Sequence, residues 1–192
     1  MANLIYGMIS SLDGYIEDTE GKFNWAEPNE SLHTYINNLY REIGTYLYGR
    51  RMYQTMMVWE TDPSFAAADT YIRHYAQIWQ AADKIVYSKT LEGVATRRTR
   101  LARDFDPEAV RQLKATAGHD LLIAGPHLAA QAFRAGLVDE CHLFLVPIIL
   151  GGGKACLPEN VRLAFELAAV HRFDNGMLHL RYQAKPGLPL TY

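Results

Sequence analysis

Three short segments of the chain carry residues suited to binding phosphate. They are residues 49–51 (Gly-Arg-Arg), 88–89 (Ser-Lys) and 124–126 (Ala-Gly-Pro). Arginine donates hydrogen bonds to phosphate in a fixed plane, and lysine supplies a compact positive charge. A glycine turn that opens a helix leaves free N–H groups for an anion. Each segment alone is as compatible with a solvated surface as with a site, but together they suggest a dinucleotide site.

Each of these segments follows a short apolar run typical of a buried strand. Helical periodicity and turn residues predict the remaining elements. The expected strands are 4–9, 15–16, 45–48, 84–87, 94–98 at an edge, 121–123, 140–146, and 163–172 with 177–185 joined by Asp174-Asn175-Gly176. The expected helices begin after Asn29, at Asp62-Pro63 and at Asp106-Pro107, and a last one ends at Gly136.

This alternation predicts a single α/β domain over residues 1–192, with helices on both faces of a sheet and a closing antiparallel hairpin. In an open α/β sheet, ligands bind beyond the carboxyl ends of the strands. The three phosphate-suited segments stand at such ends, so the fold is expected to bring them together. Tyr35 and Tyr40, on the first helix, are expected in the core.

Composition excludes several classes of function. The net charge of −2 gives no electrostatic case for binding nucleic acid. Cys141 and Cys156 are not in a metal-ligand spacing and do not suggest a disulfide framework, so we expect no metal site and a reducing, cytoplasmic environment. We also expect no signal peptide and no membrane-spanning segment.

Several motifs, in their order and spacing, resemble the dihydrofolate reductase superfamily, and most closely the RibD C-terminal (riboflavin biosynthesis reductase) domain family. The resemblance covers nearly the whole chain and suggests a stand-alone bacterial member. The motifs are Ser11-Leu12-Asp13-Gly14, Leu47-Tyr48-Gly49-Arg50-Arg51, Ala124-Gly125-Pro126-His127-Leu128, Gly136-Leu137-Val138-Asp139-Glu140, and Val146-Pro147 with Leu150-Gly151-Gly152-Gly153-Lys154. The resemblance implies a three-layer fold with a mostly parallel eight-stranded sheet, and NADPH as cofactor.

By position, the resemblance assigns cofactor contacts to the three segments and their neighbours. Phosphates would be held by Gly49, Arg50, Arg51 and Met52, the adenosine end by Ser88 and Lys89, the pyrophosphate and ribose by Ala124, Gly125, Pro126, His127 and Leu128, and the nicotinamide by Ile9 and Ile16. Relatives carry a cis Gly-Gly bond where this chain has Ala124-Gly125, so a cis bond at this position is a hypothesis that the resemblance raises. Met52 replaces a threonine of many relatives, and Pro126 lacks an N–H group.

The expected substrate side has two alternatives at each position. Asp13 forms a turn or contacts the substrate as a catalytic group. Trp25, Pro28 and Glu30 match the spacing that flanks the pteridine in folate reductases, and Glu30 would be the catalytic acid, although it equally suits a helix start. Lys154, after three glycines, meets the substrate or belongs to a mobile connection.

The predicted function is an NADPH-dependent reductase of a small nitrogen heterocycle. By resemblance, the first candidate reaction is that of 5-amino-6-(5-phosphoribosylamino)uracil reductase in riboflavin biosynthesis. The alternatives are a dihydrofolate reductase-like pterin reductase, which rests on Glu30, and a nucleotide-binding module without catalysis. The resemblance also implies a homodimer, with the strand at residues 140–147 as the suggested interface.

Overall fold

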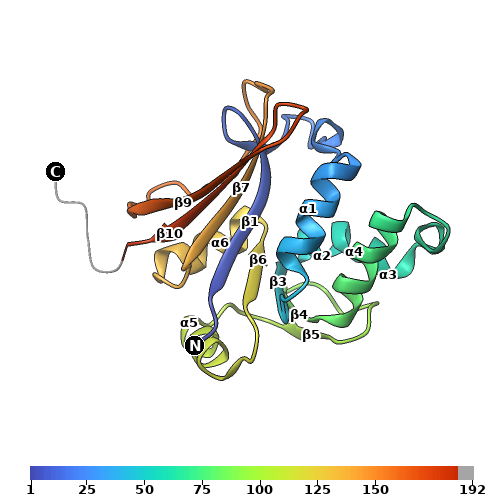
Figure 1. The fold of residues 1–192 in the computed structure, drawn as a ribbon. Helices are drawn as coiled ribbons and strands as arrows, with labels where there is room; N and C mark the ends of the chain where they lie inside the picture. The colour runs from blue at the N-terminus through green and yellow to red at the C-terminus, as the bar shows by residue number, and fades with distance from the viewer. Residues whose placement is uncertain (186–192) are drawn as a thin grey trace.

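The computed structural model describes residues 1–185. Its centre is an eight-stranded sheet with the order β5-β4-β3-β6-β1-β7-β10-β9 (Figure 1). The strands are β1 (Leu4–Ser11), β3 (Thr45–Gly49), β4 (Asp83–Tyr87), β5 (Thr99–Ala102), β6 (Leu121–Ala124), β7 (Glu140–Val146), β9 (Phe165–Arg172) and β10 (Leu178–Ala184). A separate pair joins β2 (Tyr15–Glu17) to β8 (Lys154–Ala155).

The direction of the strands confirms the predicted sheet. β1 pairs in parallel with β6 and β7, and β3 pairs in parallel with β4 and β6. β10 is antiparallel to both β7 and β9, so the chain closes with the expected hairpin. Parallel order from β5 to β7 aligns the carboxyl ends of six strands at one edge of the sheet.

Helices cover both faces of the sheet and make the fold three layers deep (Figure 1). They are α1 (Glu30–Tyr40), α2 (Arg50–Met56), α3 (Val58–Thr61) and α4 (Thr70–Ala81) towards one face, α5 (Pro107–Thr116) and α6 (Pro126–Arg134) on the other, and the short 3-10 helices η1 (Asn24–Ala26) and η2 (Pro63–Ala66).

Alternation along the central strand β1 divides the core between the two faces. Leu4 and Tyr6 pack with the helices α5 and α6, and the Tyr6 ring meets Phe133 edge-on at 5.2 Å between centroids. Ile5 points the other way, into the cluster that contains Leu32 of α1 and Trp79 of α4. Side chains two residues apart share a face of a strand, so one strand supports both layers.

The predicted helix ends are confirmed where a side chain or a glycine sets them. The side chain of Asn29 accepts a 3.0 Å hydrogen bond from the N–H of Leu32, and Asp106 caps α5 in the same way. Gly136 has φ of +63° and follows α6, where its N–H donates to the carbonyl of Phe133. These local devices satisfy backbone groups that the helix leaves unpaired.

Two elements begin and end at other residues than predicted. The edge strand runs over Thr99–Ala102 and not 94–98, because Arg98 takes a positive φ of 52° and turns the chain just before it. Asp62-Pro63 does not open a long helix. Asp62 caps the 3-10 helix η2, and α4 begins only at Thr70.

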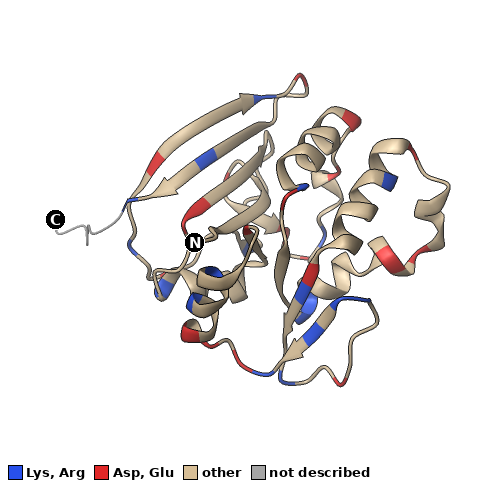
Figure 2. Cartoon of the chain, turned by 60° about the horizontal axis from the view of Figure 1, so that its bottom comes forward, with Lys and Arg blue, Asp and Glu red and all other residues tan. Residues whose placement is uncertain are grey.

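β7 lies between β1 and β10, so both of its edges are already paired. The strand at 140–147 therefore offers no free edge to a second copy, and the homodimer itself stays a prediction. Lysine, arginine and acidic residues are interspersed over the elements (Figure 2), in line with the net charge of −2. Across residues 1–185, no helix has the length and apolar character needed to cross a membrane.

Candidate functional site

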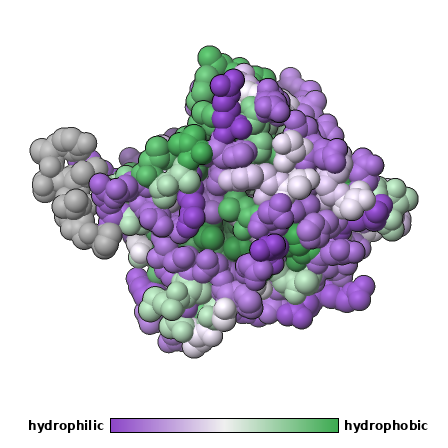
Figure 3. All heavy atoms as spheres, in the orientation of Figure 1, coloured by the Kyte–Doolittle hydropathy of each residue, from purple (hydrophilic) through white to green (hydrophobic). Residues whose placement is uncertain are grey.

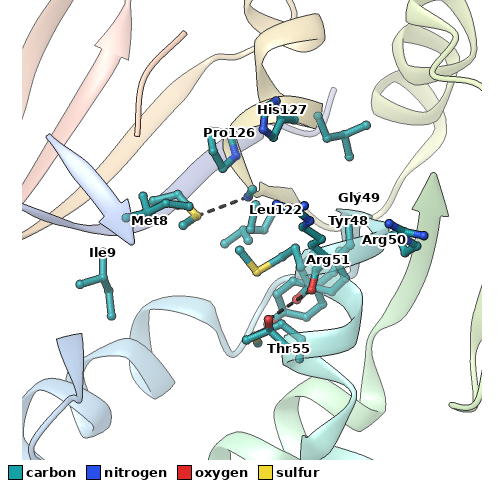
Figure 4. A pocket seen from close by; sticks show the side chains of 18 of the residues that line it. Met8, Ile9, Tyr48, Gly49, Arg50, Arg51, Thr55, Leu122, Pro126 and His127 are labelled. Carbon is teal, nitrogen blue, oxygen red and sulfur yellow. Dashed lines mark hydrogen bonds between the residues drawn. The ribbon is translucent and has the colours of Figure 1, made fainter. Parts of the chain in front are cut away.

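A cavity of about 880 Å³ opens at the carboxyl ends of β1, β3, β4 and β6 (Figure 4). Every residue predicted to contact the cofactor lines it. These are Ile9, Ile16, Gly49, Arg50, Arg51, Met52, Ser88, Lys89, Ala124, Gly125, Pro126, His127 and Leu128. The four strands are neighbours in the sheet, in the order β4-β3-β6-β1, so their ends form one continuous wall. The sheet thus assembles the three segments that the sequence keeps far apart.

The turn from β6 into α6 is built on Gly125. This residue stands at the N-cap of α6 with φ of +91°, a conformation that side-chain-bearing residues rarely adopt. Its N–H donates to the Sδ atom of Met8 at 3.3 Å (Figure 4). A Cβ atom at Gly125 would stand 3.3 Å from the Cβ of Met52, so Met52 packs closely under the turn.

The hypothesis of a cis bond between Ala124 and Gly125 is wrong, because no cis peptide bond occurs within residues 1–185. The positive φ of Gly125 redirects the chain from the strand into the helix, and the peptide bond before it is trans. Pro126 then starts α6, where its missing N–H removes no helical hydrogen bond. The departures of this chain from its relatives therefore fit the local backbone.

The positively charged side chains at the cavity differ in their hydrogen-bond and ion-pair partners. Arg50 donates through Nη1 to Thr90 Oγ1 at 3.1 Å, and Lys89 forms an exposed 3.0 Å ion pair with Asp104. The guanidinium of Arg51 has no ion-pair partner within the part of the chain that the structure describes. Arg51 therefore has the charge most available to a phosphate.

Arg103 also lines the cavity and was missed in the sequence. It follows β5, and its Nη1 donates to the carbonyl oxygens of Ser88 at 3.2 Å and Leu91 at 2.7 Å. These bonds hold the segment after β4, next to Lys89. Correct placement of the edge strand would have identified Arg103 as another basic residue at a strand end.

Asp13 lies outside the cavity lining. Its carboxylate accepts hydrogen bonds from Ser11 Oγ at 2.7 Å and from the N–H groups of Leu150 and Gly151 at 3.1 and 2.8 Å. The hydrogen bond from Ser11 is the largest cause of a lowered pKa of Asp13. The geometry therefore gives Asp13 a positioning role, in agreement with the turn alternative.

Trp25 and Glu30 are likewise not among the lining residues. Trp25 donates through Nε1 to the carbonyl of Lys22 at 3.2 Å, and Glu30 is the exposed first residue of α1. The acidic residue that this segment does bring to the cavity is Glu27. Glu30 lies in the first turn of α1, where a carboxylate stabilises the start of a helix. This position agrees with the alternative in which Glu30 serves the helix and not the substrate.

Lys154 does line the cavity, and its predicted contact with a substrate stays a prediction. Its Nζ lies 3.2 Å from Glu17 Oε1, and both side chains are mostly buried, at 16% and 26% exposed. Glu17 thus balances the charge of Lys154 between β2 and β8. Arg51, His127 and Lys154 also border a second, outer cavity of about 580 Å³ beside residues 17–21.

Four tyrosines also line the main cavity, and of these Tyr40 was expected in the core. They are Tyr40, Tyr46, Tyr48 and Tyr75, from α1, β3 and α4. Burial raises the pKa of all four, and that of Tyr40, Tyr46 and Tyr48 lies well above the usual value. These hydroxyls are therefore uncharged at neutral pH. No spacing rule marked them, because they come from three elements that only the fold brings together.

The residues present fit a nicotinamide dinucleotide. The cavity has basic side chains at the ends of β3, β4 and β5, the open backbone of Gly125 at the next strand, and the apolar Ile9 and Ile16 beyond it. Its volume lies within the range of about 300–1,000 Å³ that ligand pockets occupy. A ligand that carries both phosphates and an uncharged ring requires a cleft with a charged end and an apolar end. This cavity has both.

Comparisons with known proteins place the chain among reductase-like folds. A family model described as the RibD C-terminal domain matches residues 2–179. An uncharacterized protein of Bacillus subtilis (strain 168), YyaP, is 27% identical over 187 residues, covering 93% of each chain.

Among solved structures, a protein of Shewanella sp. PV-4 provisionally assigned to riboflavin biosynthesis superposes with a TM-score of 0.75 at 23% identity, covering 96% of this chain and 99% of that one. A pyrimidine reductase-like protein of Corynebacterium diphtheriae gives 0.66 at 14% identity, covering 97% and 93%.

A Thermotoga maritima diaminohydroxyphosphoribosylaminopyrimidine deaminase/5-amino-6-(5-phosphoribosylamino)uracil reductase gives a TM-score of 0.64 at 16% identity. The match covers 96% of this chain but only 57% of that protein. At such low identity these likenesses establish the fold, which is the predicted dihydrofolate reductase-like one.

Proposed function

Since the chain belongs to the RibD C-terminal domain family, we propose that it is an NADPH-dependent reductase of a small nitrogen heterocycle. The observation that carries the proposal is the single cavity at the ends of four adjacent strands, which gathers all the predicted cofactor-binding residues. The first substrate to test is 5-amino-6-(5-phosphoribosylamino)uracil.

The protein's own contribution is binding, orientation and exclusion of water. Arg51, with Arg50 and Lys89, would hold phosphate groups by charge-assisted hydrogen bonds. The backbone at Gly125 would allow close approach of the dinucleotide, because no side chain stands there. NADPH, when bound, supplies the hydride, and the residues around it fix where that hydride can go.

The pterin reductase alternative depends on an acid that reaches the heterocycle. Glu30 is exposed at the start of α1 and does not line the cavity, so this alternative loses its best support. A nucleotide-binding module without catalysis predicts tight NADPH binding and no NADPH oxidation with either heterocycle.

The direct test measures NADPH affinity by fluorescence titration and NADPH oxidation with 5-amino-6-(5-phosphoribosylamino)uracil or dihydrofolate. Replacement Arg51→Ala is expected to weaken NADPH binding roughly ten- to a hundredfold, because hydrogen bonds to charged groups are worth about 1.5–3 kcal/mol. Arg134→Ala, on the far end of α6, is the matched control and should change nothing. Unchanged affinity in the Arg51 variant would remove this residue from the site, and absence of turnover with both heterocycles would reject the proposed reaction.

A further inference from the structure

Reduction of a C=N double bond requires a proton as well as a hydride. When the hydride adds to the carbon atom, one electron pair of the double bond moves to the nitrogen atom, and the nitrogen must take up a proton. A side chain that holds this proton beside the substrate speeds such a step about 10²- to 10⁴-fold. A reductase of this kind therefore needs a proton donor on the wall of its cavity.

Most of the polar residues around the cavity are unsuited to this task. Arginine does not release its proton in a protein, which removes Arg50, Arg51 and Arg103. The hydroxyl oxygens of Tyr40 and Tyr46 have virtually no accessible surface, so a substrate does not reach them. The donor must be a group that both carries a labile proton and faces the cavity.

Lys154 carries such protons in the cavity wall. Its side chain is only 16% exposed, whereas Lys89, the other lysine among the described lining residues, is 78% exposed and paired with Asp104. An ammonium group has three N–H donors. One of them bonds Glu17 Oε1 at 3.2 Å, and Nζ has no other hydrogen-bond acceptor within residues 1–185. Lys154 thus keeps donors for a ligand.

An irregularity in β2 turns the partner of Lys154 towards the cavity. Glu17 lies opposite Lys154 in the antiparallel pair of β2 and β8, and the register shifts between Tyr15 and Glu17. Adjacent residues of a regular strand face opposite sides, yet Ile16 and Glu17 both line the cavity. A bulge re-aims side chains in this way. The apolar wall and the acid that holds Lys154 therefore come from neighbouring residues.

Gly153 allows the two strands to approach closely at this point. It has φ of +134°, and a Cβ atom there would overlap the backbone carbonyl oxygen of Glu17. A residue with a side chain would push the chain away, so glycine is required where the backbones pass so near. The position of the Lys154 ammonium beside Glu17 is consequently built into the backbone.

The ion pair also has a route to water. Glu17 and Lys154 border the outer cavity of about 580 Å³ as well as the main one. The outer cavity lies at the surface, because Thr19, Glu20 and Gly21 on its wall are exposed. A proton given up into the main cavity can thus be replaced from solvent on a second side.

We propose that Lys154 is the catalytic proton donor of the reductase and that Glu17 positions its ammonium group. This inference rests on the proposed function and adds the proton to it. The hydride supplied by NADPH forms the new C–H bond, and the nitrogen of the former C=N bond takes a proton from Lys154 Nζ. Lys154 is left as a neutral amine and regains a proton from water in the outer cavity, while Glu17 remains a carboxylate.

Single-turnover oxidation of NADPH with 5-amino-6-(5-phosphoribosylamino)uracil tests the donor. Lys154→Met should slow the step about 10²- to 10⁴-fold and leave the affinity for NADPH unchanged. A lysine that only binds the substrate would raise KM at unchanged kcat. Lys22→Met is the matched control and should react at the full rate, because Lys22 is exposed, pairs with Glu20 and lines neither cavity.

Chemical rescue separates proton donation from charge. Lys154→Ala should regain rate when methylammonium is added and should not respond to tetramethylammonium, which has the same charge and no N–H group. Rescue also excludes misfolding as the cause of a low rate. An unchanged rate in Lys154→Met, or equal rescue by both cations, would overturn the proposal. A rate that falls in His127→Phe instead would assign the donor to that cavity residue.

The positioning role of Glu17 has its own readouts. Glu17→Gln should lower kcat roughly tenfold at unchanged KM, because a hydrogen bond to a charged group is lost. In the protein without cofactor, acetic anhydride should label Lys154 faster in this variant, since loss of the acid favours the reactive neutral amine. Mass spectrometry measures the labelling, with exposed Lys89 as internal reference. Equal labelling and equal kcat would remove Glu17 from the proposal.

Failure of the donor and failure of the reductase are distinguishable. A wild-type protein that oxidises NADPH while Lys154→Met does so equally well keeps the proposed function and loses the donor. A wild-type protein that reduces neither this substrate nor dihydrofolate loses the proposed function, and the donor role with it.

Discussion

The carboxylate of Asp13 accepts a 2.8 Å hydrogen bond from the backbone N–H of Gly151, a residue 138 positions further along the chain. Leu150 donates to the same carboxylate, and Ser11 Oγ completes the group. The turn after β1 is thereby tied to the glycine-rich segment that leads to Lys154 on the cavity wall. One acidic side chain thus sets the position of a loop that borders the candidate site.

Replacement Asp13→Ala should release this loop. Faster hydrogen exchange of the amides of Leu150 and Gly151 is the expected result, because these two amides lose their acceptor. Exchange measured by NMR or mass spectrometry checks it. Asp18→Ala is the control, since the Asp18 carboxylate accepts from the N–H groups of Glu20 and Lys22 in its own turn. Unchanged exchange at residues 150–151 would show that the loop keeps its position without the Asp13 carboxylate.

The same contact predicts an acid dependence for the loop. The pKa of Asp13 is lowered in the folded protein, first by the hydrogen bond from Ser11. A lowered carboxyl pKa gives stability that is present above the unfolded value of about 3.9 and is lost as the pH falls through the folded value. The protection of the Leu150 and Gly151 amides, relative to unprotected amides at the same pH, should therefore persist at neutral pH and fall only in strong acid.

Gly7→Ala should destabilise the protein by about 1–3 kcal/mol, the usual effect of overpacking a core. The added methyl group would clash with the Tyr40 hydroxyl at 2.5 Å. Chemical denaturation measures the change. The matched control is Gly93→Ala, where the new Cβ meets nothing within 4 Å. Combining Gly7→Ala with Tyr40→Phe should restore part of the stability, whereas simple additivity of the two changes would contradict this contact as the cause.

His179 should make the fold sensitive to mild acid. Its Nδ1 is 2.9 Å from the Tyr35 hydroxyl, and its ring stacks on Phe144 at 4.4 Å between centroids. Burial, with smaller effects of His142, His171 and Arg181, lowers the pKa of His179 to about 3. A lowered histidine pKa means that its stability is present above the unfolded value of about 6.5 and lost as the pH falls towards 3.

Below pH 6, protonation of His179 in the unfolded chain should consequently lower the free energy of unfolding by about 1.4 kcal/mol for each unit by which the pH falls. Denaturant titrations across pH 4–6 measure the slope, and His179→Phe should reduce it. His74→Phe, at an exposed position of α4, should leave the slope as it is. A slope that persists undiminished in the His179 variant would assign the acid sensitivity to other groups.

The homodimer remains a prediction, and the sheet suggests where to look for it. β9 is an edge strand with an exposed apolar surface, in which Leu167 is 50% and Val170 is 55% exposed. Apolar side chains gather on the side of the molecule where β9 and β10 lie (Figure 3). The double replacement Leu167→Lys and Val170→Lys should convert a dimer into a monomer by light scattering, because charge disfavours edge pairing. A wild-type protein that is already monomeric would reject the dimer.

Much of the cavity wall at the strand ends was predictable, because each of its segments is local in the sequence. Each basic or glycine segment directly follows an apolar run, and parallel strands bring their carboxyl ends to one edge. Arg103 escaped because the positive φ of Arg98 shifted the edge strand, and no sequence pattern announces a left-handed arginine. The cap at Asp62-Pro63 also did not give the type of helix that follows it. The same cap can open a short 3-10 helix or a long α-helix.

The sequence by itself determined the class of fold, the helix caps at Asn29 and Asp106, the glycine turn at 125 and the segments that line the cavity at the strand ends. These depend on periodicity and on interactions within a few residues. Only the tertiary structure decided that Asp13 holds Gly151, that Glu30 stays outside the cavity, and that the Tyr40 hydroxyl packs against Gly7. Such meetings depend on sheet order and on how α1 packs against the sheet, which join residues that no local pattern connects.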